Sequence, residues 1–317
     1  MNKTKVLNHG RKTVFSILRA AILIEIGFIV LYPVLYMLSM AFRPVEQMYN
    51  PNVIWVPLSL TMDNIKQVVE FMDFPKAAWT TLYLDVISAV LQTFVCCIVG
   101  YGFARFNFKG KNILFAVVIF TIVVPPSTTL ISSYLQYRSF DVAYIFSAFN
   151  WIFTGNFEGI KLLNTPFVMW LPALFGMGIR SGLFIFMFRQ SFMEMPKEFE
   201  EAAYIDGCGS YKCFLKIMLP NAKTIIITVL LFSLVWYYND TYFSATYMDS
   251  LRTISTSLEY LNENLATLSP TGAVMDRYQV VTLVQAACLL AITPLTVFYI
   301  IMQRHFTESV QRSGLVG

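Results

Sequence analysis

Side chains that could carry out covalent or metal chemistry are scarce in this chain of 317 residues. It contains two histidines, His9 and His305, which lie near opposite ends of the sequence. They cannot supply an HExxH zinc site or a Ser–His–Asp triad, and the apolar segments contain no pair of catalytic aspartates. The five cysteines are odd in number and three lie in apolar runs, which argues against a disulfide framework. We therefore expect neither an enzyme nor a metal or cofactor site.

The chemistry that remains is recognition of a solute. Arg180 is the charged residue placed deepest within a predicted membrane span, where a charge costs roughly 3 kcal/mol or more and needs a cavity or a partner. Contact with a solute path is one interpretation, and an ion pair or snorkelling between helices is the commoner one. Gly178 and Gly182 predict a close helix contact on the same span. Asp85 lies near a predicted span end and is interpreted as a snorkelling charge, as is Glu25.

A second set of candidate solute-binding residues lies where the fifth apolar segment ends: Tyr237, Tyr238, Asn239 and Asp240, directly after Trp236. Aromatic faces can stack on a pyranose ring while amide and carboxylate groups bind its hydroxyls. An aromatic belt at the membrane interface accounts for the rings without any ligand, and is the favoured interpretation for Trp236.

The link between the fourth and fifth apolar segments has the most specific spacing in the sequence. Pro196 suits the first position of a helix whose N-terminal end is stabilised by the glutamates that follow, Glu198, Glu200 and Glu201. We expect Gly207 and Gly209 to stop this helix, Ser210 to cap a second short helix and Pro220 to close it. The link is thus predicted to form a helix–turn–helix elbow outside the membrane.

The composition indicates that lipid surrounds most of the chain. Apolar residues make up 56% and charged residues 13%, whereas soluble domains carry about 25% charge. Six segments are long and apolar enough to cross a membrane: residues 20–42, 79–104, 112–135, 166–188, 222–239 and 279–302. Pro125, Pro126 and Pro294 are expected to break or kink the third and sixth. The first is interpreted as an uncleaved anchor after a basic leader, residues 1–19.

Lysine and arginine counts predict the orientation. Alternate links sum to fifteen basic residues on one side and seven on the other, with Arg180 inside a span. Because the basic leader and the tail at 303–317 lie on the richer side, both termini are predicted to be cytoplasmic, and the elbow with them.

The elbow also carries the residues of a known signature. Glu201, Ala202, Ala203, Gly207, Ile217, Leu219 and Pro220 follow the spacing EAA-x3-G-x9-I-x-LP without a gap. The chain resembles the permease subunits of bacterial ATP-binding-cassette importers. The segment from Gly100 to Phe106, the residues Trp236, Asn239 and Asp240, and the tail ending at Gly317 resemble the carbohydrate, maltose-type branch. Thr80 and Thr81 depart from it, standing where that branch usually has an Asn–Ser or Asn–Thr pair.

The resemblance implies an all-α, six-span membrane protein with the type I importer (MetI-like) fold. Its five-helix core would be residues 79–302, with the coupling loop at about 194–220. The elbow, Asp206 included, would dock on a cytoplasmic ATPase subunit that binds ATP and Mg²⁺, since this chain has no GxxxxGK[ST] loop. Two ATPase copies, a second permease and an extracellular solute-binding protein are the implied partners, in a bacterial cell membrane.

Two alternatives stay open. One is a secondary transporter or channel that works without ATP, which predicts buried coupling charges or inverted repeats. The other is an importer permease for a solute that is not a sugar. The long aromatic link at residues 136–165 is given no role beyond a short amphipathic helix on the outer leaflet.

Overall fold

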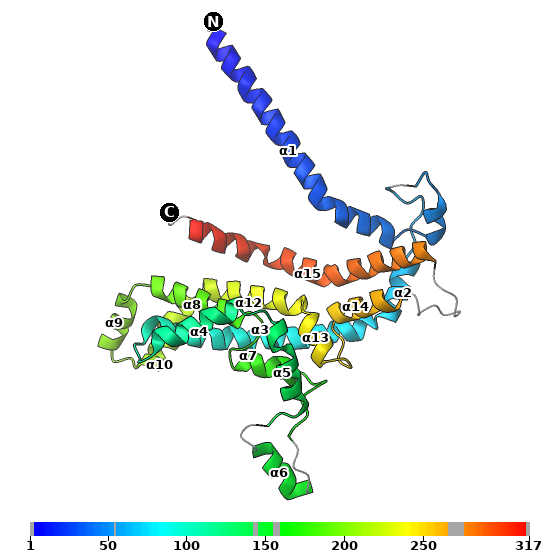
Figure 1. The fold of residues 1–317 in the computed structure, drawn as a ribbon. Helices are drawn as coiled ribbons and strands as arrows, with labels where there is room; N and C mark the ends of the chain where they lie inside the picture. The colour runs from blue at the N-terminus through cyan, green and yellow to red at the C-terminus, as the bar shows by residue number, and fades with distance from the viewer. Residues whose placement is uncertain (1–2, 54, 142–144, 155–158, 266–275, 315–317) are drawn as a thin grey trace. The chain divides into compact units, whose positions relative to one another are not determined.

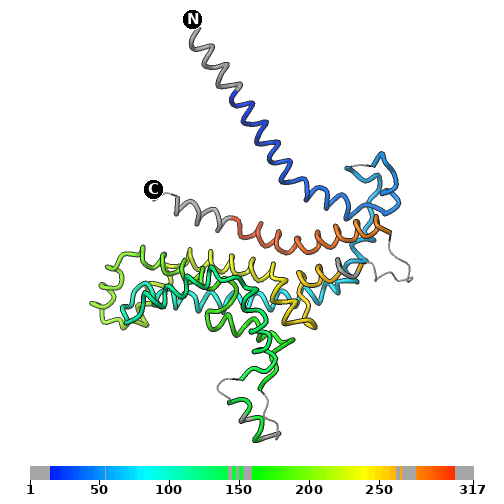
Figure 2. Tube along the Cα trace, in the orientation of Figure 1, coloured from blue at the N-terminus to red at the C-terminus, as the bar shows by residue number. Residues whose placement is uncertain are grey.

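A computed structural model describes residues 3–53, 55–141, 145–154, 159–265 and 276–314 (Figures 1 and 2). Regular structure in these ranges is helical, with one isolated antiparallel bridge between Phe140 and Ile160. The predicted all-α class is therefore confirmed. The chain divides into two compact units, Met1–Phe71 with Leu261–Ile292 and Met72–Tyr260 with Thr293–Gly317. The predicted leader and tail reach beyond the described residues at 1–2 and 315–317.

The larger unit is built around α3 (Phe74–Arg105). This helix packs against α7 (Phe167–Leu174), α8 (Ser181–Glu194) and α12 (Lys223–Tyr238), while α4 (Lys111–Val123) packs on α8 (Figure 1). Helix α3 has a proline in its first turn and Arg105 in its last turn, which suit the two ends of a helix. Its contact with α8 buries the rings of Phe184, Phe188 and Phe192 completely.

Shorter helices complete this unit at the two ends of the bundle. At one end lie α9 (Glu198–Ile205) and α10 (Ser210–Cys213), followed by a π-helical turn (Phe214–Met218) and α11 (Leu219–Asn221) (Figure 1). Toward the other end lie α5 (Ser127–Arg138), α6 (Ile145–Thr154) and α13 (Tyr242–Tyr247). Two further helices, α14 (Ile254–Asn264) and α15 (Arg277–Gly314), each contribute residues to both units.

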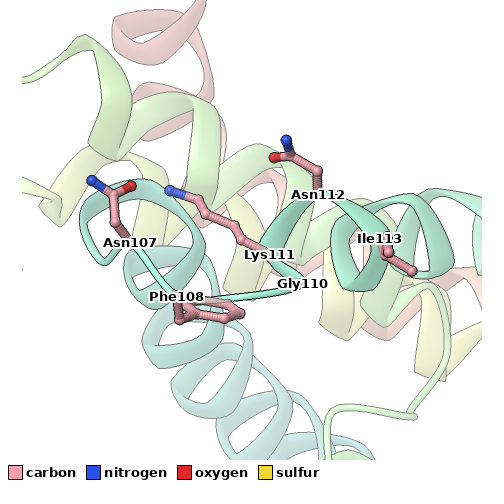
Figure 3. Close-up of a pocket in the computed structure, with 6 residues that line it drawn as sticks. All are labelled: Asn107, Phe108, Gly110, Lys111, Asn112 and Ile113. Atoms are coloured by element: carbon pink, nitrogen blue, oxygen red, sulfur yellow. The ribbon is translucent and has the colours of Figure 1, made fainter.

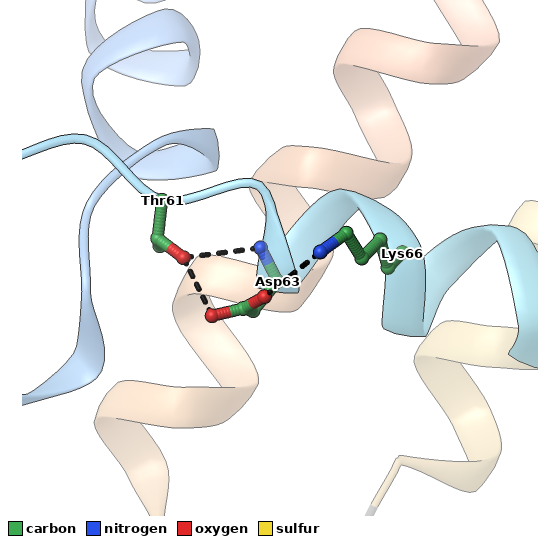
Figure 4. A network of polar contacts seen from close by, with 3 residues as sticks. All are labelled: Thr61, Asp63 and Lys66. Carbon is green, nitrogen blue, oxygen red and sulfur yellow. Dashed lines mark hydrogen bonds and ion pairs between the residues drawn. The ribbon is translucent and has the colours of Figure 1, made fainter.

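The smaller unit contains α1 (Lys3–Ala41), the 3₁₀ helix η1 (Val45–Tyr49) and α2 (Asp63–Phe71). The buried Arg43 donates to the Val53 carbonyl, and the Asn64 amide donates to the Ala41 and Arg43 carbonyls. At the start of α2 the Thr61 hydroxyl donates to Asp63, 2.7 Å away, and Lys66 pairs with the same carboxylate (Figure 4). Both contacts lower the pKa of Asp63, the hydroxyl more than the ammonium.

Three helical stretches are long and apolar enough to cross a membrane, and the number rises to five if each of two bent pairs forms one crossing. The three are Phe15–Ala41, Phe74–Arg105 and Arg277–Gln303. In one bent pair, α4 and α5 meet at 101°, because Pro125 and Pro126 interrupt the helix as predicted. In contrast, α15 continues through Pro294.

The predicted span at residues 166–188 is not one continuous helix. Helix α7 ends at Leu174, and α8 begins only at Ser181. Between them Gly176 and Arg180 adopt left-handed backbone angles, with φ of 69° and 61°, which a right-handed helix cannot contain. Gly178 lies in this break and Gly182 in α8, so they do not share one helix, although each lies in close contact with a neighbouring element.

Candidate functional site

The elbow predicted from the sequence forms at one end of the larger unit. Helix α9 stops at Ile205, and Gly207 follows with a φ of 78°, a left-handed conformation that glycine adopts without a Cβ clash. The Gly207 and Cys208 amides donate to the carbonyls of Tyr204 and Ala203 at 3.1 and 2.9 Å, which closes the helix end. The turn reverses the chain into α10.

The second half of the elbow differs from the prediction in two details. Gly209, and not Ser210, occupies the N-cap position of α10. Pro220 does not close the second helix, because helical structure continues through α11 to Asn221. The π-helical turn before it widens the backbone, so that the Leu219 amide bonds the Phe214 carbonyl five residues earlier. Ile217 and Leu219 are half-buried and Pro220 is exposed.

The elbow is fixed to α3 by a buried ion pair. Arg105 Nε lies 3.0 Å from Glu200 Oε2, and both side chains are about nine-tenths buried. The Tyr101 hydroxyl donates to Glu200 Oε1 at 2.7 Å, and a second guanidinium nitrogen of Arg105 donates to the Met195 carbonyl at 2.8 Å. The carboxylate of Glu200 is thus held by two groups from the end of α3.

The signature residues divide between two faces of α9. Glu201 and Ala202 are exposed, as are Asp206 and Gly207. Ala203 is 3% exposed and packs in the apolar cluster of its own chain with Phe192 and Cys213. Of the two alanines, only Ala202 is therefore exposed. Two large apolar side chains, Tyr204 and Ile205, stand exposed beside it.

The short basic link between α3 and α4 lies next to this anchor, because Arg105 ends α3. It borders an open hollow of about 450 Å³ lined by Asn107, Phe108 and residues 110–113 (Figure 3). The Lys111 ammonium donates to the Phe106 carbonyl at 2.9 Å and holds the turn closed. The hollow is bordered by one local loop, so we assign it no ligand.

Residues of the predicted solute path lie at the break between α7 and α8. The sequence predicted Arg180 to be the deepest charge, but its side chain is exposed. Among the described residues, the buried charged side chains are those of Arg43, Asp85 and Glu200. The guanidinium of Arg180 lies over the Trp236 ring, 4.6 Å from its centroid. Asp85, predicted to snorkel, is 7% exposed and lies on the packed side of α3.

The four residues after Trp236 face different surroundings. Tyr237 is buried beside Gly178 and borders a cavity of about 480 Å³ at the break, while Tyr238 is half-buried. The exposed Asn239 donates from its amide to the Val235 carbonyl of its own helix. The Asp240 carboxylate accepts from the Phe243 and Ser244 amides at 3.2 and 2.9 Å, at the start of α13. The last two side chains therefore have structural partners within the chain.

Residues 96–312, which include both the elbow and the break, match the sequence family described as the inner membrane component of binding-protein-dependent transport systems. The chain belongs to this family. It is a permease subunit of an ATP-binding-cassette importer and not an enzyme, since the ATPase is a separate subunit. It is accordingly a multi-pass bacterial membrane protein.

Relatives resemble this importer permease along its whole length. Protein LplC of Bacillus subtilis is 26% identical over 324 residues, which cover 100% of this chain and 98% of LplC. The arabinooligosaccharides transport system permease protein AraQ of Halalkalibacterium halodurans is 26% identical over 301 residues, 92% of this chain and 93% of AraQ. The crystal structure of a bacterial transporter that imports the acidic polysaccharide alginate contains a chain with a TM-score of 0.71 at 19% identity, covering 93% and 98%. The permease fold is thereby established.

Sequence reasoning missed the anchor of the elbow. From the sequence, Glu200 is expected only to stabilise the N-terminal end of its helix. Arg105 enters only as part of the segment from Gly100 to Phe106 and of the lysine and arginine count. The available signal was their context: an arginine ending a long apolar helix, and a glutamate one residue before the exposed Glu201. The sequence does not reveal that the two meet, because 95 positions separate them.

Proposed function

We propose that this permease forms half of a translocation pathway for a sugar or oligosaccharide, and that its elbow couples the pathway to a cytoplasmic ATPase. A solute-binding protein outside the cell would deliver the solute, and a second, different permease would form the other half. Support for a carbohydrate comes from the names of relatives, among them an arabinooligosaccharide permease.

The coupling role rests on one observation: an exposed elbow fixed to the central helix by a buried ion pair. A displacement of α9 is transmitted to α3 through Arg105 and Glu200, because a buried pair is costly to separate. Glu201, Ala202, Asp206 and Gly207 form the face toward the ATPase, and Ile217, Leu219 and Pro220 support it from the second half. ATP and Mg²⁺ bind only to the ATPase pair.

The proposed topology has six crossings with both termini in the cytoplasm. The fourth crossing along the chain would be the interrupted pair α7 and α8, which together contain 22 helical residues. The proposed boundaries are a leader at 1–19, a first crossing at 20–42, a core at 79–302 and a tail at 303–317. Arg180, Tyr237, Tyr238, Asn239 and Asp240 are proposed to border the solute path.

The coupling role is tested with two substitutions on the exposed face, Glu201→Lys and Gly207→Asp. Each is expected to reduce co-purification of the ATPase by about tenfold or more, because a reversed charge or an added side chain at a docking contact costs several kcal/mol. ATP-dependent uptake should fall with it. Glu194→Lys, at an exposed position nearby, is the control for Glu201→Lys. The thermal midpoint of Gly207→Asp separates lost docking from strain at its left-handed backbone. Unchanged co-purification and uptake in Glu201→Lys and Gly207→Asp would overturn the proposal.

A further inference from the structure

The break between α7 and α8 borders a cavity of about 480 Å³ within the larger unit. Its walls come from both sides of the break, from the proline break between α4 and α5, and from Tyr237 and Tyr247. Small-molecule sites typically measure about 300–1,000 Å³, so the cavity has the size of a ligand site. Two interrupted helices therefore meet at one half-open cavity.

A single charge faces this cavity. Among all the residues that line it, Arg180 is the only one with a charged side chain, and no aspartate or glutamate takes part. In the described part of the chain, neither of the two ion pairs involves Arg180. An exposed guanidinium that meets no acidic side chain on the cavity wall can pair with an anion that enters the space it faces.

Arg180 is held in a costly backbone conformation. Its φ of 61° is left-handed, which costs an ordinary residue roughly 1–2 kcal/mol. Such outliers persist where the surrounding structure enforces them, and they cluster at ligand clamps. Asparagine or glycine would adopt this backbone conformation at lower cost than arginine does.

The flanking residues fix this conformation. The fully buried amide of Gln92 donates to the Ile179 carbonyl at 2.5 Å and to the Ser181 hydroxyl at 2.9 Å, and its carbonyl accepts from Ser233. The residues on both sides of Arg180 are thereby tied to α3. Trp236 supports one face of the guanidinium. Because a planar guanidinium carries its N–H donors at its edge, stacking leaves the fork available to a carboxylate.

The rest of the wall is mostly apolar, and tyrosines and hydroxyl groups make up its polar part. Tyr137, Tyr237 and Tyr247 provide rings and hydroxyls, and Thr129 and Ser133 add further hydroxyls on the side of α5. Rings can cover the C–H faces of a sugar. The Thr129 and Tyr247 hydroxyls donate to the Pro126 and Leu130 carbonyls, so toward a sugar they act as acceptors. One guanidinium can pair with one carboxylate through two parallel hydrogen bonds.

We propose that this cavity binds an acidic saccharide, with Arg180 pairing with the carboxylate of a uronic acid unit. This inference rests on the proposed function, because it names the class of solute that the same pathway carries. The glutamine clamp would then position the guanidinium, and the tyrosine-lined wall would contact the remainder of the ring.

Binding of digalacturonate and of its neutral counterpart galactobiose tests the inference. The intact importer, with its second permease and ATPase subunits, is placed in phosphatidylcholine nanodiscs and titrated calorimetrically without the solute-binding protein. Digalacturonate is expected to bind more tightly than galactobiose, and Arg180→Gln should weaken digalacturonate binding about 10- to 100-fold, as loss of a charged hydrogen-bonded pair predicts. Arg180→Lys should restore part of the affinity, since it keeps the charge without the fork.

Arg252→Gln is the matched control, because Arg252 also lies over an aromatic ring, that of Tyr260, and does not line the cavity. The inference is overturned if wild type fails to bind digalacturonate, if Arg180→Gln binds it as wild type does, or if galactose 1-phosphate binds more tightly. Displacement of digalacturonate by a soluble short-chain phosphatidylglycerol, in the same phosphatidylcholine nanodiscs, would instead assign the site to a lipid headgroup. Co-purification of the ATPase in wild type, but not in Glu201→Lys, keeps the coupling proposal standing in each of these cases.

Discussion

At the residue scale, two adjacent glutamates of the elbow have opposite surroundings. Glu200 is buried against Arg105 and Tyr101, whereas Glu201 is exposed. The difference follows from helical geometry: consecutive residues are about 100° apart around the axis, so only one of the two can face α3. The signature residue is thus available to a partner because its neighbour holds the helix in place.

Glu200→Gln is expected to loosen the elbow. The neutral amide leaves Arg105 as a buried charge without its counter-ion, and removing one partner of a buried pair typically costs about 3–5 kcal/mol. Mass spectrometry should detect faster maleimide labelling of Cys213, which is completely buried beside the anchor. Glu201→Gln, one position along, should leave the labelling rate as in wild type. Equal rates in both variants would mean that the ion pair does not hold the elbow.

At the scale of elements, the interrupted helices are stabilised by contacts that replace helical hydrogen bonds. A break inside a membrane span exposes carbonyl and amide groups that lipid cannot satisfy. Gln92 supplies a donor to the Ile179 carbonyl, and the backbone turns of Met177 and Ser181 onto Pro172 and Gly178 satisfy others. One buried amide from a neighbouring helix therefore makes the break tolerable.

Gln92→Leu should destabilise the larger unit. The apolar side chain leaves the Ile179 carbonyl and the Ser181 and Ser233 hydroxyls without this partner, at about 1–3 kcal/mol for a buried group. Thermal unfolding in detergent should show a lower midpoint than wild type. Gln136→Leu, on the exposed surface of α5, is the control and is expected to unfold as wild type does.

The contact between α4 and α8 depends on a missing side chain. A Cβ at Gly182 would lie 2.9 Å from the Val118 carbonyl oxygen and closer still to the Thr121 hydroxyl. Gly182→Ala is expected to lower stability by about 1–3 kcal/mol, as overpacking does. Gly102→Ala, where nothing lies within 4 Å, should be neutral or stabilising because alanine is the better helix former. Thermal midpoints of the two variants that shift alike would argue against close packing as the cause.

At the scale of the whole molecule, charge asymmetry and helix breaks make a joint prediction about topology. Alkaline phosphatase fused after Ser59 should be active, since this link carries few basic residues and is expected outside. A fusion after Gly110 should be inactive, and a fluorescent protein in the same two positions should give the reverse pattern. Activity after Gly110 would contradict six crossings with cytoplasmic termini.

The sequence by itself determined the membrane class, the helical fold, the proline break near Pro125 and the position of the elbow. These properties depend on local quantities: apolar length, backbone constraints of proline and glycine, and spacing along one segment. Hydrophobic periodicity did not reveal the interruption at residues 175–180, because the residues before Arg180 are apolar or glycine. One of its two left-handed residues is an arginine, a residue type that does not predict that conformation.

Only the tertiary structure decided which polar residues meet. The pairs Arg105–Glu200 and Gln92–Ser181 join positions about ninety residues apart, and Arg180 finds its ring in Trp236 on another helix. The physical reason is that hydrogen bonds and ion pairs act over a few ångströms. Their partners are fixed by how the helices pack, and no single helix carries that information in its own residues.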